Sequence, residues 1–173
     1  MPLSATTLYD ELDSNIDNVN TEAEAILGWA TVFDNYFQEA LAVITPPATG
    51  IAVTPGTTVA AKTAMQGALA GINTAGAGAA VIANGITAYW GGLNANAAAI
   101  FVSIPPATGI TPPTGLGTLQ TALQTAFTAN ITSNVTKEVA LTAIATAIHA
   151  IQIVGGICVF PVPPVGIGPL PIL

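Results

Sequence analysis

Apolar and polar positions alternate at helical spacing in the first quarter of the chain. Apolar residues recur at steps of four, four and three, at Leu8, Leu12, Ile16 and Val19. Thr21, followed three positions later by Glu24, forms the sequence pattern of a capping box and predicts the start of a second helix. The inner stripe of this second helix is predicted to comprise Ile26, Trp29, Phe33, Phe37, Ala40, Leu41 and Ile44.

The middle of the chain predicts a second pair of helices. Thr57 or Thr58 is expected to cap the first of them, whose aligned apolar residues are Met65, Leu69 and Ile72. The second helix is expected over residues 75–102, with Gly91 and Gly92 as candidates for an interruption. Glycine costs about 1 kcal/mol relative to alanine in a helix. Its frequent use here predicts close contacts between helix backbones at Gly67, Gly71, Gly76, Gly78 and Gly85.

The last third of the chain predicts a third pair. Thr118 is expected to cap a helix whose aligned residues are Leu119, Leu123 and Phe127. Ser133 or Asn134 is expected to cap the final helix, which carries Leu141, Ile144, Ile148 and Ile151 on one face. The periodicity therefore predicts six helices arranged as three hairpins.

A short motif punctuates these hairpins. The sequence PPATGI occurs at 46–51 and again at 105–110, 59 positions later, and VFPVPP at 159–164 is a third relative. Proline removes a backbone donor and restricts the residue before it, so each Pro-Pro pair is expected to end a helical hairpin. Repetition near this period is typical of stacked supersecondary units. The predicted units are 1–47, 48–106 and 107–164.

The predicted fold is all-α. We expect a six-helix bundle in a single domain, residues 1–164, built from three helical-hairpin repeats joined by Pro-Pro linkers. An extended apolar arm, residues 165–173, follows it. The whole tail from residue 162 is uncharged and holds four prolines, so it cannot form a helix.

An apolar tail left in water would promote aggregation, so we expect it to dock into a groove on a neighbouring subunit. Trp90, beside two glycines, is the candidate for an exposed aromatic anchor at an interface. The predicted interface residues are Trp90, Pro163, Pro164, Ile167, Leu170, Ile172 and Leu173.

Charge is scarce and unevenly distributed. Only 6% of the 173 residues are charged, none is arginine, and the formal net charge is −7. Eight of the nine acidic residues lie in the first 39 positions, and no charge occurs between Thr63 and Thr136. Long neutral faces indicate surfaces covered by other copies or other subunits, or alternatively by lipid. Nucleic acid is not expected as a partner, because binding its phosphates requires several cations.

Two uncharged stretches, 75–104 and 139–160, are long enough to span a bilayer. They are rich in Ala, Thr, Asn and Gly and lack flanking basic clusters, so we favour helices buried by protein. A small membrane-embedded or membrane-active helical protein is the alternative interpretation. The first residues, MPLSATTLYDELD, have no basic and apolar signal pattern, and we expect the chain to fold in a cytoplasm.

The strongest motif for a ligand is DSNIDNVNTEAE, residues 13–24. It places Asp13, Asn15, Asp17 and Glu24 at positions 1, 3, 5 and 12 of a calcium-binding loop. The glycine expected at position 6 is Asn18 and the apolar residue expected at position 8 is Asn20, and both departures count against the motif. A polar turn followed by a capped helix explains Glu24 without a metal, and the two interpretations remain open here.

No constellation of catalytic residues is present in the sequence. His149 lies on an Ala/Ile helix without a nearby acid or thiol, so we expect it to be packed or at an interface. Cys158 lies in the apolar segment GGICVF, where burial would raise its pKa and make it inert. We therefore expect no enzyme, no cofactor and no small-molecule substrate.

In style, the whole chain resembles small structural proteins of tailed bacteriophages. The resemblance rests on the MPLSATTL leader, the acidic amphipathic helix that follows it, and the Ala/Thr/Gly helices separated by turns such as PPATGI. It implies a noncatalytic virion component of the tail, baseplate or capsid surface, present in many copies. Its expected partners are other copies of itself and other virion proteins, and its expected location is the virion.

Overall fold

The computed structural model describes residues 3–16, 19–40, 42–44, 51–53, 57–74, 76–97, 109–133, 135–152, 157–159 and 170–171. Its described residues contain six helices, which confirms the predicted all-α bundle class. They are α1 (Ala5–Asn15), α2 (Glu22–Gln38), α3 (Val59–Ala68), α4 (Gly78–Ala95), α6 (Leu116–Ser133) and α7 (Lys137–Gln152).

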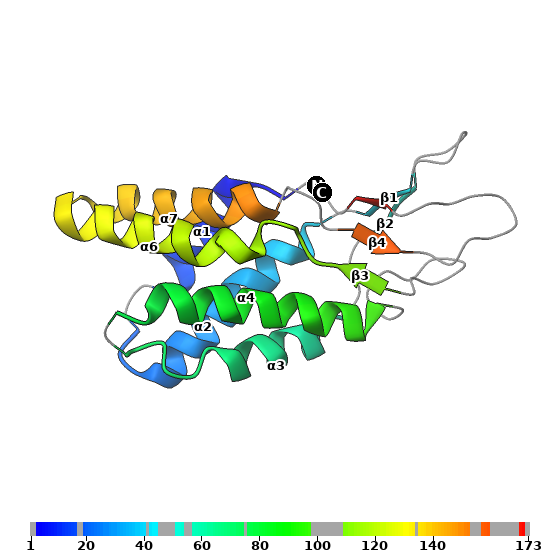
Figure 1. Cartoon of the computed structure of the whole chain (residues 1–173), viewed down its shortest axis with the longest axis horizontal. Helices are drawn as coiled ribbons and strands as arrows, with labels where there is room; N and C mark the ends of the chain where they lie inside the picture. Colours follow the sequence, from blue (N-terminus) through cyan, green and yellow to red (C-terminus); the bar gives the residue numbers. More distant parts are fainter. Residues whose placement is uncertain are drawn as a thin grey trace, which may run out of the picture.

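The six helices form a closed ring. Each helix packs against the next one in the chain, and α7 returns to pack against α1 (Figure 1). The α4 and α6 helices lie in front in the view of Figure 1, and α1 and α2 lie behind them. Because every helix has two neighbours, each one buries an apolar stripe and keeps one polar side outward.

Aromatic side chains from α2 and α4 fill the centre of the ring. Phe33, Phe37 and Tyr89 pack edge to face, with ring centroids 5.0 Å and 5.5 Å apart. Phe37 also meets Trp90 edge to face at 5.4 Å. Such pairs contribute about 0.5–1.5 kcal/mol beyond the burial of their area. Of the inner stripe predicted for α2, Trp29, Phe33, Phe37 and Ala40 are buried in the core, and Ile26 is partly buried. Leu41 lies outside the described residues.

Two glycines of α4, Gly85 and Gly92, allow it to pack closely against α3. Of the glycines predicted at close helix contacts, only Gly85 lies at this one. A Cβ atom on Gly85 would lie 2.8 Å from a side-chain carbon of Leu69, and one on Gly92 would lie 2.6 Å from the Cα of Ala61. Gly67 has open space beside it, so the prediction is wrong there. Gly71 and Gly76 instead occupy turns with φ of +84° and +77°, which glycine adopts readily. The expected interruption is absent, since α4 runs through Gly91 and Gly92.

Helix starts were predicted with mixed success. The capping box of Thr21 and Glu24 is present at the start of α2, as predicted. Thr58 is the N-cap of α3 but makes no side-chain capping bond. Thr118 lies inside α6, where its hydroxyl donates to the carbonyl of Gly115, so the predicted cap is wrong. At the start of α7, Thr136 accepts from the amide of Val139 and takes the place predicted for Ser133 or Asn134.

Short strands lie beyond one end of the helices, on the right in Figure 1, and the sequence did not predict them. They are β1 (Ala42–Ile44), β2 (Ile51–Val53), β3 (Gly109–Thr111), β4 (Ile157–Val159) and β5 (Leu170–Pro171). The β1 and β2 strands pair antiparallel, and β3, β4 and β5 form a second antiparallel sheet in that order. Ile44 was predicted on a helix that in fact ends at Gln38. Residues before a proline favour extended backbone, and β-branched side chains favour strands.

Each copy of the PPATGI motif ends in one of these strands. Ile51 begins β2, and the equivalent residue of the second copy, Ile110, is the middle residue of β3. The two copies pair differently, because β2 pairs with β1 whereas β3 pairs with β4. The Pro-Pro pairs at 46–47, 105–106 and 163–164 lie outside the described residues. The three-unit repeat therefore remains a prediction.

Candidate functional site

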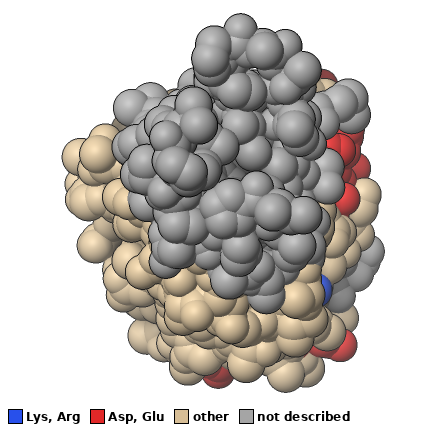
Figure 2. Space-filling model, turned by 90° about the vertical axis from the view of Figure 1, so that its right-hand side faces the viewer, with Lys and Arg blue, Asp and Glu red and all other residues tan. Residues whose placement is uncertain are grey.

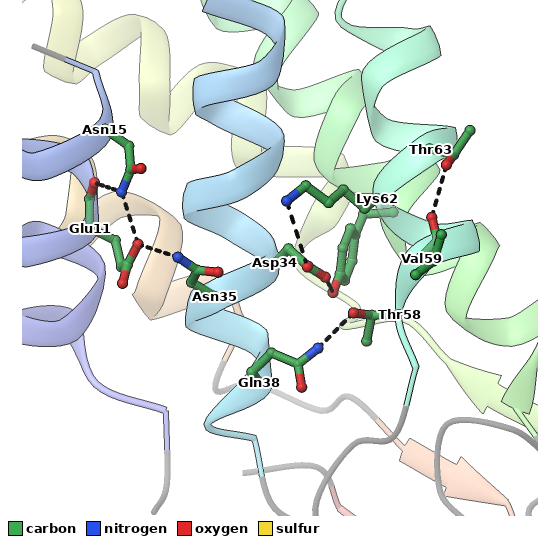
Figure 3. Close-up of polar contacts among 10 residues, drawn as sticks. Glu11, Asn15, Asp34, Asn35, Gln38, Thr58, Val59, Lys62 and Thr63 are labelled. Atoms are coloured by element: carbon green, nitrogen blue, oxygen red, sulfur yellow. Dashed lines mark hydrogen bonds and ion pairs between the residues drawn. The ribbon is translucent and has the colours of Figure 1, made fainter.

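Several acidic residues of α1 and α2 contact neighbouring segments through neutral donors. The carboxylate of Glu11 accepts hydrogen bonds from Asn35 at 2.7 Å and from Asn15 at 3.0 Å, which ties α1 to α2 (Figure 3). Glu39 accepts from the hydroxyl of Thr7 at 3.1 Å across the same pair of helices. Glu22 accepts from the backbone amide of Gly71, in the turn between α3 and α4. Hydrogen bonds to a charged group contribute about 1.5–3 kcal/mol each.

The densest polar cluster joins α2, α3 and α4 around Asp34. The hydroxyl of Tyr89 donates to the Asp34 carboxylate at 2.7 Å, and Lys62 lies 3.9 Å from its other oxygen (Figure 3). Burial raises the pKa of the Tyr89 hydroxyl well above its ordinary value, and the negative charge of Asp34 adds to the effect. Tyr89 therefore stays protonated and acts as a hydrogen-bond donor rather than as a base.

A further contact explains why Thr58 does not cap α3. Its hydroxyl oxygen accepts a hydrogen bond from the Nε2 of Gln38 at 2.6 Å, and its residue is only 4% exposed. Figure 3 shows Gln38 on α2 reaching toward Thr58 at the start of α3. The side chain thus joins two helices instead of closing the first turn of one.

His149 is packed against Tyr36, in agreement with one of its two predicted roles. The Tyr36 hydroxyl lies 2.8 Å from the Nδ1 of His149, and the rings meet edge to face. Burial lowers the pKa of His149 and raises that of Tyr36, so both groups are held in their neutral forms. This hydrogen bond between a neutral tyrosine and a neutral imidazole joins α2 to α7.

The calcium interpretation is not supported by the positions of its described ligands. Glu24 accepts from the amides of Asn20 and Thr21, both at 2.9 Å, as the capping-box interpretation requires. Asp13 forms an ion pair with Lys137 at 2.8 Å. Asp17 lies outside the described residues. Within the described part of the chain, no group of three or more His, Cys, Asp or Glu side chains converges on one point.

Trp90 is buried, so its prediction as an exposed anchor is wrong. It is 1% exposed, and its Nε1 donates to the Oε1 of Gln152 at 2.7 Å, which links α4 to the end of α7. The Nε2 of Gln152 has no hydrogen-bond partner among the described residues. The spacing of the apolar residues on α4 contained the signal for burial, since the buried stripe reads Ile82, Ile86, Tyr89, Trp90 and Leu93.

The other predicted interface residues belong to the C-terminal tail. Leu170 lies in β5, whose backbone pairs with β4 of the same chain in the register Cys158 to Leu170. This part of the arm is therefore extended, as predicted, and it pairs within its own chain. Pro163, Pro164, Ile167, Ile172 and Leu173 lie outside the described residues.

The outward side of α6 is uncharged along its whole length. Its exposed residues are mainly Thr and Gln, and a shallow depression of about 380 Å³ lies along Gln124, Thr125, Thr128, Ala129 and Thr132. The hydroxyls of Thr125 and Thr132 donate to backbone carbonyls one turn earlier, at 2.9 Å and 2.8 Å. In Figure 2 the charged residues lie along the right and lower edges, and the left side shows none.

Comparison with protein-family models, with curated proteins and with solved structures finds no match to this chain. Among the helices that the structure describes, none is both long and apolar enough to cross a membrane.

Proposed function

We propose that the chain is a noncatalytic structural subunit of a tailed-bacteriophage virion that acts by protein–protein assembly. The observation that carries the proposal is the uncharged outward side of α6, a helix whose inner side closes the bundle. A soluble domain that works alone normally disperses charge over its surface. This chain instead concentrates its charge on one part of the ring and leaves another part neutral.

The hydrogen bonds of α6 support the same proposal energetically. Burying a hydroxyl without a partner costs about 1–3 kcal/mol by the measure of protein mutants. The donors of Thr118, Thr125 and Thr132 are already used within α6, at 2.8–2.9 Å, so covering them leaves no hydroxyl proton unpaired. A neighbouring subunit can therefore cover these three hydroxyls at low desolvation cost.

The described polar clusters also fit a structural role. The carboxylates of Glu11, Asp34 and Glu39 each contact a donor on another helix. In this arrangement the carboxylates hold helices together, and the hydroxyl nearest to one of them, that of Tyr89, is kept protonated. The carboxylates thus stabilise the helical bundle, and the uncharged side of α6 is the surface that contacts other subunits.

The proposal is tested first by quantitative mass spectrometry of purified particles from the source phage. The chain should be present in a fixed, symmetry-related number of copies per particle. Its presence only in the soluble lysate would overturn the assignment.

A second test addresses the surface itself. Thr125→Glu or Thr128→Glu places a charge on the neutral side and should abolish incorporation into particles while leaving the helical circular dichroism unchanged. Ala23→Glu is the matched control, because Ala23 is exposed on α2, in the acidic part of the ring. Equal incorporation of all three variants would show that α6 is not the assembly surface.

A further inference from the structure

A cleft of about 270 Å³ lies between α1 and α7, away from the neutral side of α6. It is lined by Ala5, Thr6, Tyr9, Glu138, Thr142, Ala145 and Thr146. Pockets for drug-sized ligands usually measure about 300–1,000 Å³. This cleft is smaller, and its size suits a single long side chain.

The threonine hydroxyls and the carboxylate of this cleft belong to exposed residues and are open to a partner. In the described structure, the hydroxyls of Thr6, Thr142 and Thr146 have no hydrogen-bond partner, although each can both donate and accept. The exposed carboxylate of Glu138 likewise has no partner among the described residues. The cleft is therefore lined by several oxygen acceptors together with the ring of Tyr9.

The surroundings of the cleft are negative. Asp10, Asp13 and Glu138 all raise the pKa of the Tyr9 hydroxyl, after the larger contribution from desolvation, and Lys137 acts in the opposite direction. Three carboxylates and one ammonium group thus act on Tyr9, and that ammonium group already pairs with Asp13 at 2.8 Å. Such a site attracts a cation and repels an anion.

We propose that this cleft binds an arginine side chain of a different protein, with the guanidinium between the Tyr9 ring and the Glu138 carboxylate. A guanidinium is planar, stacks on aromatic rings and donates in a fork that matches a carboxylate. Its remaining N–H groups would be satisfied by the threonine hydroxyls.

The occupant is a different protein because this chain has no arginine, and both of its lysines form ion pairs, with Asp34 and Asp13. The inference rests on the assembly role proposed above and names the chemistry of one partner. It does not depend on where in a virion the chain lies.

The test uses the full-length chain labelled with ¹⁵N and the blocked peptide Gly-Arg-Gly as the probe. Titration should produce saturable NMR shifts confined to the amides that line the cleft, above all Thr6, Tyr9, Thr142 and Thr146. The matched peptide carries citrulline, which keeps the shape of arginine and lacks its charge, and it should cause no such shifts. The proposal is overturned if the cleft amides do not move or if both peptides bind equally.

Two variants separate the cleft from general attraction by a negative protein. Glu138→Gln should weaken peptide binding about fivefold, the factor expected for the loss of about 1 kcal/mol from an exposed ion pair. Asp10→Asn removes the same charge one residue from Tyr9 but outside the cleft, and should weaken binding by less than half of that factor. Equal losses in the two variants would indicate nonspecific attraction and overturn the proposal. Thr142→Val, which keeps the shape of the side chain, should also weaken binding because one acceptor is lost.

The two proposals fail independently. If the chain is absent from particles but the arginine peptide shifts the NMR signals of the cleft amides, the virion assignment is wrong and the cleft proposal is retained. If the chain is incorporated into particles and the peptide causes no NMR shifts, the cleft proposal is wrong and the assembly role is retained.

Discussion

At the scale of single residues, neutral donors hold most of the described carboxylates. Glu11 contacts asparagine amides, Glu39 contacts a threonine hydroxyl and Asp34 contacts a tyrosine hydroxyl. With only two lysines and no arginine, the chain cannot balance its acids with cations. Neutral donors supply the stabilisation instead, and this explains how acids cluster in the first 39 residues without disrupting the bundle.

The contact between Tyr89 and Asp34 provides the prediction at this scale. Tyr89→Phe removes a donor to a charged acceptor and should lower the free energy of unfolding by about 1.5–3 kcal/mol, measured by urea denaturation. Tyr9→Phe is the matched control and should change it by no more than about 0.5 kcal/mol, because Tyr9 is only partly buried and its hydroxyl makes no hydrogen bond with the described residues. Similar losses in the two variants would contradict the importance of the Asp34 contact.

At the scale of elements, the closest packing joins α3 to α4. The backbone of α4 approaches that of α3 at Gly92, beside Ala61, and the side chain of Leu69 fills the space beside Gly85. Burial of these residues brings Lys62 of α3 within reach of Asp34 on α2. The close packing of α3 against α4 therefore requires glycine at positions 85 and 92.

Gly92→Ala should destabilise the bundle by about 1–3 kcal/mol, because the added methyl group meets backbone atoms of α3 that cannot move independently. Gly91→Ala, the neighbouring substitution, adds the same methyl group where nothing lies within 4 Å. It should stabilise α4 by about 0.5–1 kcal/mol, since alanine is the better helix former. Thermal unfolding of both variants checks the pair, and a loss of stability in Gly91→Ala would contradict the described packing.

At the scale of the whole molecule, charge divides the ring into an acidic part and a neutral part. The net charge of −7 makes the acidic part repel itself, while only two ion pairs are present among the described residues. One of them, between Lys137 and Asp13, is half exposed on both sides and contributes little. Repulsion therefore outweighs attraction in the electrostatics of the fold.

Added NaCl should accordingly stabilise the isolated chain. Salt at about 0.5 M shortens the screening length several-fold relative to about 0.01 M, which weakens the repulsion between exposed carboxylates. Hydrogen bonds to neutral donors such as Asn35 and Tyr89 are less affected. Urea midpoints measured at the two salt concentrations check this prediction, and a lower midpoint at high salt would show that attractive ion pairs dominate.

The sequence alone determined the helical class, the order of the helices and the capping box at Thr21, because each depends on residues close together in the chain. It also identified Trp29, Phe33 and Phe37 as the inner stripe of α2, since a helical period orders side chains without reference to a partner, but it extended that stripe wrongly to Ile44. For His149 the sequence predicted a packed or interface position. Its contact with Tyr36 could be found only in the folded structure.

The tertiary structure alone decided the features that join distant segments. The short strands, the burial of Trp90 against Gln152 and the cleft between α1 and α7 all unite residues far apart in the chain. A strand of three residues gains its hydrogen bonds only from a partner strand, so its own sequence hardly distinguishes it from a turn. Similarly, a tryptophan beside two glycines has the same local sequence whether it faces solvent or a core, and the neighbouring helices decide between the two.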